Sequence, residues 1–356
     1  MNILVTAAGS PGFITVQKAI HAAKGVPKNV MLHGCDINGA SLGMKLADRS
    51  FIAPRGDSDD YITELLSYCR KNNIDLLIPC ADEELLPLAT NKHLFEEMGC
   101  KVLVSGEASI RTALNKSRLF QFCANNHLSE YIVEYSVCNN VEDLLKTYYK
   151  MIDAGLKVCV KPTKAHGSRG FRVIEPLTSK STFFNSKAQP NSITIDSLCE
   201  ILGNEEFPEL LIMEYLPGSE YSVDCFKRDG DFLCVPRTRE IIKEGICVAG
   251  KVVKNEALMH AANKIYNKIG LSYNANIQFR YNEAGRPVLL EINPRFSGTM
   301  EHCRAAGVNF VEVAIRNILN LEDLDYKIKW NVAMTRVWNE IFQDENGLYT
   351  LGENNE

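Results

Sequence analysis

A pair of neighbouring strand-like segments near residue 290 places polar side chains at alternate positions. Residues 274–280 read Asn-Ala-Asn-Ile-Gln-Phe-Arg, and the apolar run 287–290 leads into three further polar residues: Glu291, Asn293 and Arg295. Alternate side chains of an extended strand share a face, so each strand presents one polar face. If residues 283–286 form a four-residue loop, Gln278 lies opposite Glu291. Oxygen ligands beside an arginine suit Mg²⁺ or Mn²⁺ shared with phosphate oxygens, and the hairpin therefore predicts a site for a nucleoside triphosphate.

The composition is that of a globular protein with more than one domain. At 356 residues, 46% hydrophobic and 23% charged, the chain is long enough for two or three domains with cores of their own. No apolar run approaches the roughly 20 residues of a membrane span. Residues 1–5 enter a strand without the basic and apolar zones of a signal peptide. We therefore expect a cytoplasmic protein that does not associate with membranes.

Cysteine spacing and charge narrow the expected partners. The twelve cysteines are scattered, without a Cys-x-x-Cys pair or a histidine spacing typical of zinc. They are expected to be reduced thiols or small buried hydrophobic groups. The formal net charge of −5 disfavours nucleic acid, because binding of a phosphate backbone needs a dense basic face. Small molecules are the expected partners.

Patterning divides the chain into three expected regions. Residues 1–109 alternate strand and helix patterns, which predicts an open parallel α/β sheet covered by helices. Residues 110–190 form a second lobe with strands near 157–161 and 170–174. Residues 191–356 form a third lobe that carries the polar hairpin.

Five segments follow one another in an order that is hard to reach by chance. They are Lys116 within 115–120, Val160-Lys-Pro162 followed by 166–170, the segment 213–224, Gln278, and Glu291-Ile-Asn-Pro-Arg295. Together they resemble the ATP-grasp superfamily, and most closely its single-unit proteins similar to one synthetase half of the carbamoyl phosphate synthetase large subunit. The resemblance covers nearly the whole chain. It implies a Rossmann-like domain followed by two α+β lobes that hold a nucleotide between them, two Mg²⁺ ions, and transfer of the γ-phosphate of ATP to a carboxylate.

The resemblance assigns phosphate-binding roles to two lysines and a loop. Lys161 ends an apolar strand just before a loop whose amides can approach phosphates, and Lys116 begins a helix, where free amides favour anions. The resemblance implies that the loop residues Gly167 and Ser168 cover the phosphates. Relatives often carry more glycine in this loop, so Arg169 is either a further phosphate contact or a surface charge.

The remaining roles concern the nucleoside, the metals and the substrate. The resemblance implies main-chain reading of adenine near Tyr215 and Leu216, and side-chain roles for Glu214 and for Glu220, the latter as acceptor for the ribose hydroxyls. It implies metal ligation by Glu291 and Asn293 with Gln278 as a further ligand, and neutralisation of the transferred phosphoryl group by Arg295. Arg237 or Arg239 is expected to hold the substrate carboxylate. Contacts to substrate are left open for a further group of residues: Arg239, Cys247, His302 and Glu84.

The expected function is an ATP- and Mg²⁺-dependent ligase that activates a carboxylate as an acyl phosphate and joins it to an amine. The resemblance is also compatible with a homodimer. Two alternatives remain. Residues 7–12 with Asp36 approach a dinucleotide fingerprint, which would suit an NAD-dependent oxidoreductase. A nucleotide-binding sensor or subunit without turnover is the other.

Overall fold

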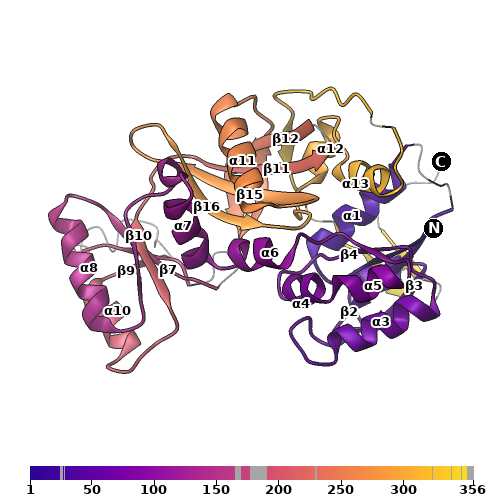
Figure 1. The fold of residues 1–356 in the computed structure, drawn as a ribbon, viewed down its shortest axis with the longest axis horizontal. Helices are drawn as coiled ribbons and strands as arrows, with labels where there is room; N and C mark the ends of the chain where they lie inside the picture. The colour runs from indigo at the N-terminus through magenta and orange to yellow at the C-terminus, as the bar shows by residue number, and fades with distance from the viewer. Residues whose placement is uncertain are drawn as a thin grey trace.

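The computed structural model describes residues 1–24, 27, 29–164, 170–176, 191–228, 231–322, 324–337, 339–345 and 347–350. Three bodies follow one another along its longest axis: a small lobe, a large lobe and an N-terminal domain (Figure 1). The expected fold class, a parallel α/β domain followed by two α+β lobes, is confirmed. No helix among these residues is long and apolar enough to cross a bilayer.

The N-terminal domain is a parallel sheet in the order β3-β2-β1-β4-β5. Its strands are β1 (Asn2–Val5), β2 (Met31–Asp36), β3 (Arg49–Ile52), β4 (Leu76–Ile78) and β5 (Lys101–Val102). Its helices are α1 (Pro11–His21), α2 (Leu42–Leu46), α3 (Tyr61–Lys71), α4 (Leu85–Thr90), α5 (Lys92–Glu97) and α6 (Glu107–Ala113). β1 is apolar on both faces: Ile3 and Val5 enter one core and Leu4 enters the other. Burial on both faces is typical of a parallel sheet covered by helices.

The small lobe is a sheet in the order β6-β10-β7-β8-β9. Its elements are β6 (Tyr135–Cys138), α8 (Val141–Asp153), β7 (Val158–Pro162), β8 (Arg172–Ile174), β9 (Ser192–Ile193), α10 (Ile195–Leu202) and β10 (Leu210–Glu214). β9 and β10 lie beyond residue 190, where we expected the lobe to end, and yet both pair in this sheet. By strand pairing the lobe therefore extends to Glu214. The helix before it, α7 (Lys116–Asn125), packs Leu119 and Cys123 into the core of the large lobe.

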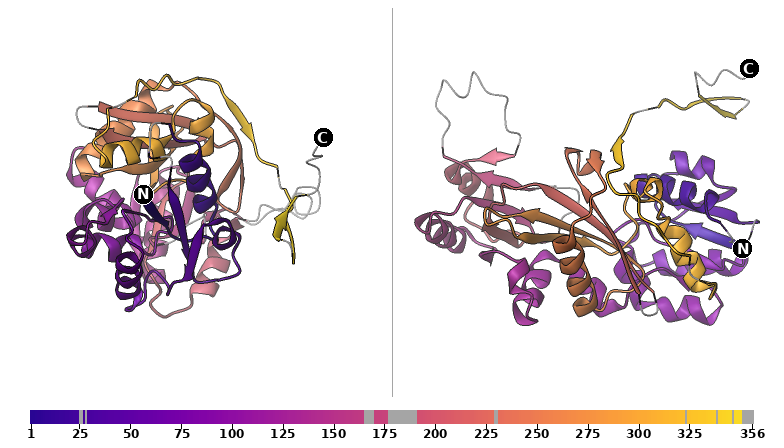
Figure 2. Two further views of the ribbon diagram at one scale, coloured as in Figure 1. Left: turned by 90° about the vertical axis from the view of Figure 1, so that its right-hand side faces the viewer. Right: turned by 90° about the horizontal axis from the view of Figure 1, so that it is seen from above.

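The large lobe is built on an antiparallel sheet in the order β12-β11-β15-β16. These strands are β11 (Glu220–Arg228), β12 (Asp231–Thr238), β15 (Asn274–Tyr281) and β16 (Pro287–Asn293). The other elements of the lobe and of the chain end are η1 (Ser129–Tyr131), β13 (Ile241–Lys243), β14 (Ile246–Lys251), α11 (Glu256–Ile269), α12 (Glu301–Ala305), α13 (Phe310–Ile318), β17 (Ala333–Thr335), β18 (Phe342–Asp344) and β19 (Gly347–Tyr349). The hairpin β18–β19 projects from the rest of the chain (Figure 2) and contacts the N-terminal domain through Gln343, which accepts from the Lys45 ammonium.

The β15–β16 hairpin has the expected pairing, reached by a different route. Its connection, residues 282–286, is one residue longer than we expected, and Tyr281 pairs with Pro287. A β-bulge then lets Leu290 pass without a partner, so that Gln278 faces Glu291 as predicted. A bulge breaks the alternation of side chains at one point. Leu290 and Glu291 consequently both line the same cavity.

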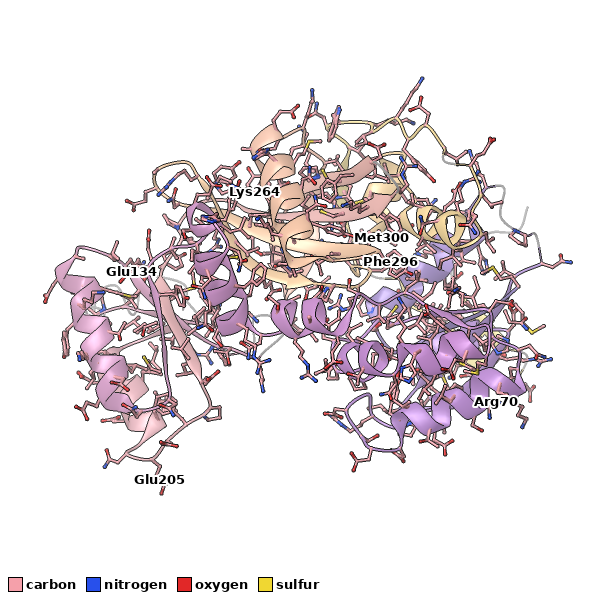
Figure 3. All side chains as sticks on the ribbon, in the orientation of Figure 1. Arg70, Glu134, Glu205, Lys264, Phe296 and Met300 are labelled. Carbon is pink, nitrogen blue, oxygen red and sulfur yellow. The ribbon has the colours of Figure 1, made fainter. Side chains whose placement is uncertain are left out.

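One hydrophobic core joins the N-terminal domain to the large lobe. It contains Ile3 and Phe13 of the N-terminal domain together with Phe296 and Met300 of the segment after β16. Figure 3 labels the last two where the large lobe meets the N-terminal domain. The two bodies are therefore held in a fixed relation by apolar burial, and side chains at their junction can act together.

Candidate active site

A cavity of about 510 Å³ lies where the small-lobe sheet faces the large-lobe sheet. Strands β7 and β10 supply one wall, and β15 and β16 supply the opposite wall. Residues singled out from the sequence line it from both sides: Lys116, Lys161, Glu214, Tyr215, Leu216, Glu220, Gln278 and Glu291. The structure therefore brings together groups that lie up to 175 positions apart in the chain, from 116 to 291.

Lys161 is a partly buried cation at the end of β7. Its Nζ donates to the carbonyl of Leu290 at 3.2 Å and lies 5.5 Å from the centre of the Phe120 ring. Burial lowers the pKa of Lys161 to about 8, and the nearby Lys116 ammonium adds to this effect. The carbonyl that accepts this hydrogen bond belongs to Leu290, the bulged residue of β16.

Lys116 and Glu291 form an ion pair across the cavity, with Nζ 3.4 Å from Oε2. The Asn115 side chain caps α7 by accepting from the Arg118 amide, and the Lys116 amide donates to the Thr163 carbonyl at 3.0 Å. These contacts fix the start of α7 against the end of β7. Burial alone would raise the pKa of Glu291, but the two lysine ammonium groups hold it below its usual value.

The oxygen ligands expected for a metal gather around Glu291. The Asn293 Nδ2 donates to Glu291 Oε1 at 3.3 Å, and Gln278 lies directly opposite on β15. The set holds one carboxylate and two amides. Within the described residues no group of three His, Cys, Asp or Glu side chains is placed to hold a metal. The donor chemistry fits a hard cation that takes its remaining ligands from phosphate oxygens.

The other end of the cavity is apolar and runs along residues 215–219, the connection between β10 and β11 that joins the two lobes and is called the hinge below. Its apolar lining comprises Cys159, Phe171, Met213, Leu216 and Leu290. Burial raises the pKa of the Cys159 thiol to about 12, so the thiol is neutral. The Tyr215 amide is already bonded to the Lys157 carbonyl at 2.7 Å, whereas the Leu216 N–H has no acceptor in the described part of the chain. A flat heterocycle with an acceptor nitrogen would suit this end, and Leu216 rather than Tyr215 offers it a free donor.

Glu220 occupies the edge of the cavity between two guanidinium groups. Its Oε1 lies 2.9 Å from Arg239 Nε, and its Oε2 lies 3.6 Å from Arg280 Nη2. We had singled out Glu220 and Arg239 separately, and had placed Arg280 on a polar face without assigning it a role. Arg239 therefore contacts the predicted ribose acceptor.

Arg295 is turned toward the N-terminal domain. Its Nε and Nη2 donate to the two carboxylate oxygens of Asp82 at 2.8 and 3.0 Å, and its Nη1 donates to the Phe296 carbonyl at 3.2 Å. Burial lowers the pKa of Arg295, but the Asp82 carboxylate outweighs this and raises it overall. The acidic segment 82–84 follows β4 at the carboxyl edge of a parallel sheet, where such sheets bind ligands. The sequence argument chose Glu84 from this segment, whereas the structure brings Asp82 to Arg295.

Arg237 does not occupy the position we expected. Its side chain is 0% exposed, pairs with Asp224, and donates to Thr299 Oγ1 at 2.9 Å and to Ser297 Oγ at 3.3 Å. It does not line the cavity. A substrate carboxylate cannot reach it in this arrangement, so the prediction that Arg237 holds substrate is corrected to a role in the core of the large lobe.

The remaining candidates are also engaged by the protein. Glu84 accepts from Thr6 Oγ1 at 2.5 Å and from the amides of Cys80 and Ala81, all within the N-terminal domain. The Cys247 thiol is buried and contacts the Ala249 carbonyl at 3.2 Å. His302 is buried, with Nε2 bonded to the Val332 carbonyl at 2.7 Å. The predicted phosphate loop with Gly167, Ser168 and Arg169 lies outside the described residues.

The glycine turn at residues 7–12 differs from a dinucleotide site in the use of its acidic residue. Asp36 Oδ2 accepts from the Gly9 amide at 2.7 Å, and Oδ1 accepts from the Asn38 amide at 2.9 Å. In a dinucleotide fold the corresponding acid binds the ribose hydroxyls. Here it stabilises the turn itself, which disfavours the oxidoreductase alternative.

Comparisons with known families agree with this geometry. Residues 206–340 match the family model described as "ATP-grasp in the biosynthetic pathway with Ter operon", and residues 3–103 match the model "PylC-like, N-terminal domain". A search of curated proteins found no significant match.

Solved structures share the fold at low sequence identity. N5-carboxyaminoimidazole synthetase from Staphylococcus aureus, complexed with ADP, has a TM-score of 0.70 and 14% identity over 93% of this chain and 80% of its own. The biotin carboxylase domain of Hydrogenobacter thermophilus 2-oxoglutarate carboxylase, in complex with MgADP, ADP and bicarbonate, has a TM-score of 0.65 and 16% identity. The match covers 93% of this chain and 73% of that domain. L-amino acid ligase from Bacillus licheniformis has a TM-score of 0.61 and 12% identity, and the match covers 89% of this chain and 74% of the ligase. At these identities the likeness establishes the fold.

The corrected role of Arg237 makes a stability prediction. Arg237→Met should lower the free energy of unfolding by about 3–5 kcal/mol, because it leaves the Asp224 carboxylate buried without a countercharge. Adding Asp224→Asn should recover part of the loss. Urea denaturation followed by circular dichroism measures both, with the exposed Arg70→Met (Figure 3) as control. An unchanged midpoint for Arg237→Met would contradict the assignment.

Proposed function

We propose that this chain, which has an ATP-grasp domain behind a PylC-like N-terminal domain, is an ATP- and Mg²⁺-dependent carboxylate–amine ligase. It would activate a small-molecule carboxylate as an acyl phosphate, join it to an amine, and release ADP and phosphate. The observation that carries the proposal is the pair of lysines, the buried Lys116 and the partly buried Lys161, which lie near Glu291 in a cavity with an apolar end. Cations, oxygen ligands and an apolar slot complement the three parts of a metal-bound nucleoside triphosphate: its phosphates, its metal ion and its base.

The positive charge of two lysines at the polar end of the cavity favours binding of a polyphosphate. Burial makes the ammonium form of Lys161 costly, and its only direct oxygen contact in the described residues is the neutral Leu290 carbonyl. A phosphate oxygen would stabilise that ammonium far more than a carbonyl does. Lys116 shares the same space and would add a second positive charge.

The oxygen set would hold the metal. Glu291, Asn293 and Gln278 offer one negative charge and two neutral oxygens, so a bound Mg²⁺ would keep positive charge to neutralise phosphate oxygens during transfer. At the apolar end the Leu216 N–H would donate to adenine, with the Glu214 carboxylate nearby. Glu220 would accept from the ribose hydroxyls.

The reaction needs a dry, positive site rather than covalent help from the protein. A carboxylate oxygen of the substrate would attack the γ-phosphorus while the bond to the β-phosphate oxygen breaks, giving an acyl phosphate and ADP. The amine would then attack the acyl carbon, phosphate would leave, and the amine would lose a proton. Arg295 lies two residues from Asn293, and its guanidinium is held by Asp82. We propose that it stabilises the phosphoryl group from this side.

Similar structures support this class of reaction. One is complexed with ADP, one with MgADP, ADP and bicarbonate, and one is an L-amino acid ligase. One of them is described as a dimer, and we extend the expectation of a homodimer to this chain. A sensor without turnover is the alternative, and a nucleotide that binds without being consumed would favour it.

The decisive test is ADP release from Mg-ATP in the presence of paired panels of carboxylic acids and amines. Turnover should require one acid and one amine together. Glu291→Gln should lower kcat about 100-fold or more, because it removes the charged metal ligand while preserving shape. Glu205→Gln, at the exposed tip of the small lobe (Figure 3), should leave kcat unchanged. Full activity of Glu291→Gln would refute the metal assignment.

The depressed pKa of Lys161 predicts a pH profile for nucleotide affinity. Bound phosphates would raise this pKa, so affinity should be complete below the free value of about 8 and fall as pH rises through it. Above pH 8 the dissociation constant for Mg-ATP should increase roughly tenfold per pH unit, because each binding event must then take up a proton. Calorimetric titrations between pH 7 and 9.5 measure this.

Two controls isolate Lys161. Lys161→Arg should give a flat profile over the same range, because the guanidinium stays charged. Adenosine, which has no phosphate, should bind wild-type protein with little dependence on pH. If the dissociation constant of wild-type protein for Mg-ATP did not change over this pH range, Lys161 would not bind the phosphates.

A further inference from the structure

Glu220 is the central member of a charge cluster that spans three adjacent strands. Glu220 begins β11, Arg280 is its pairing partner on β15, and the Arg239 amide just after β12 donates to the Glu220 carbonyl at 2.9 Å. Because β11 lies between β12 and β15, the sheet order places one arginine on each side of the carboxylate. The side chains are largely shielded, with exposures of 15% for Glu220, 7% for Arg239 and 26% for Arg280.

We propose that Arg239 and Arg280 are positioning residues that fix the Glu220 carboxylate for the two hydroxyls of ribose, and so make the site select ribonucleotides over deoxyribonucleotides. The inference rests on the proposed binding of ATP in this cavity. It assigns a function to two residues that do not themselves need to touch the nucleotide.

The division of the carboxylate oxygens supports this role. Arg239 approaches Oε1 at 2.9 Å, and Arg280 approaches Oε2 at 3.6 Å. A carboxylate has about four lone-pair sites, two on each oxygen. Within the described residues Arg239 Nε makes no hydrogen bond and the Arg280 contact is longer than one, so both arginines hold the carboxylate as ion pairs and leave acceptor sites on both oxygens. A ribose presents two neighbouring hydroxyl donors, which can use one acceptor site on each oxygen.

Both arginines are anchored at other points of the cavity wall. Arg280 Nη1 donates to the Leu216 carbonyl at 3.0 Å, and its guanidinium carbon lies 5.8 Å from the centre of the Tyr215 ring. Arg239 Nη2 donates to the Gly245 carbonyl at 2.8 Å. Leu216, Tyr215 and Gly245 all line the cavity. The carboxylate is thus held from the hinge and from the β13–β14 turn.

The hinge contact also joins the two lobes. The Tyr215 ring contacts two cations: Lys157 Nζ is 5.0 Å from its centre, and the Arg280 guanidinium carbon is 5.8 Å from it. Lys157 directly precedes β7 of the small lobe, whereas Arg280 belongs to β15 of the large lobe. Contacts between a cation and an aromatic face are attractive. Pre-organisation of this wall would lower the ordering cost of nucleotide binding.

The test compares nucleotides that differ only in ribose hydroxyls. Affinities for Mg-ATP, Mg-2′-deoxy-ATP and Mg-3′-deoxy-ATP are measured by calorimetry. Wild-type protein should prefer ATP over each deoxy analogue by about tenfold or more, as expected for a hydrogen bond to a charged group. In Arg239→Met and Arg280→Met the preference should fall below about threefold, mainly through weaker ATP binding. Arg70→Met serves as the surface control and should keep the wild-type ratio.

A double-variant cycle distinguishes positioning from a general structural effect. Glu220→Gln should also reduce the ratio, and adding Arg280→Met to it should cause little further reduction, because both changes act through one carboxylate. An ion pair that only stabilised the fold would change the thermal midpoint and leave the ratio intact. If the methionine variants do not fold, Arg239→Lys and Arg280→Lys replace them and should reduce the ratio at least about threefold, because an ammonium cannot hold the carboxylate in a planar fork.

The outcomes separate this inference from the proposed function. If wild-type protein binds no ATP, the proposed function fails. If it binds ATP and both deoxy analogues equally, or if every folded arginine variant keeps the wild-type ratio, the positioning role is overturned while ATP binding stands.

Discussion

The site depends on charges of opposite sign that are largely shielded from solvent and held on facing lobes. Lys161 comes from the small lobe, Lys116 from the helix that precedes it, and Glu291 from the large lobe. Burying an ion is costly unless a partner compensates it. Here two ammonium groups lie near one carboxylate, and burial together with the nearby Lys116 ammonium lowers the pKa of Lys161. An anionic ligand between the lobes would favour the charged form of Lys161 and stabilise the arrangement of the lobes.

A single irregularity in β16 makes that arrangement possible. The bulge at Leu290 turns its carbonyl to Lys161 while Glu291, the next residue, reaches Lys116 and stays opposite Gln278. In a regular strand these neighbouring residues would serve opposite faces. The bulge therefore lets one strand contact both lysines, and it compensates the longer turn at residues 282–286. Local backbone geometry here sets the electrostatics of the whole cavity.

The sequence predicted which strand faces are polar and where strands end better than it predicted which residues those polar side chains contact. The parallel sheet and the pairing of Gln278 with Glu291 follow from short periodic patterns, and the structure has both. Arg237 was misplaced because alternation along a strand does not tell whether a polar face meets a cavity or another buried charge, here Asp224. The extension of the small lobe to Glu214 was missed for a similar reason, since β10 pairs with strands that lie earlier in the chain. Long-range pairings of this kind depend on the assembled fold.

The N-terminal domain contributes to the site through position rather than through a nucleotide site of its own. Its glycine turn uses Asp36 internally, while Asp82, at the edge of the same sheet, orients Arg295 from 213 positions away. The apolar core shared with Phe296 and Met300 fixes the distance between them. Loss of that core would release Arg295 even if every cavity residue were kept. The domain therefore holds the Arg295 guanidinium at its junction with the large lobe, two residues beyond Asn293.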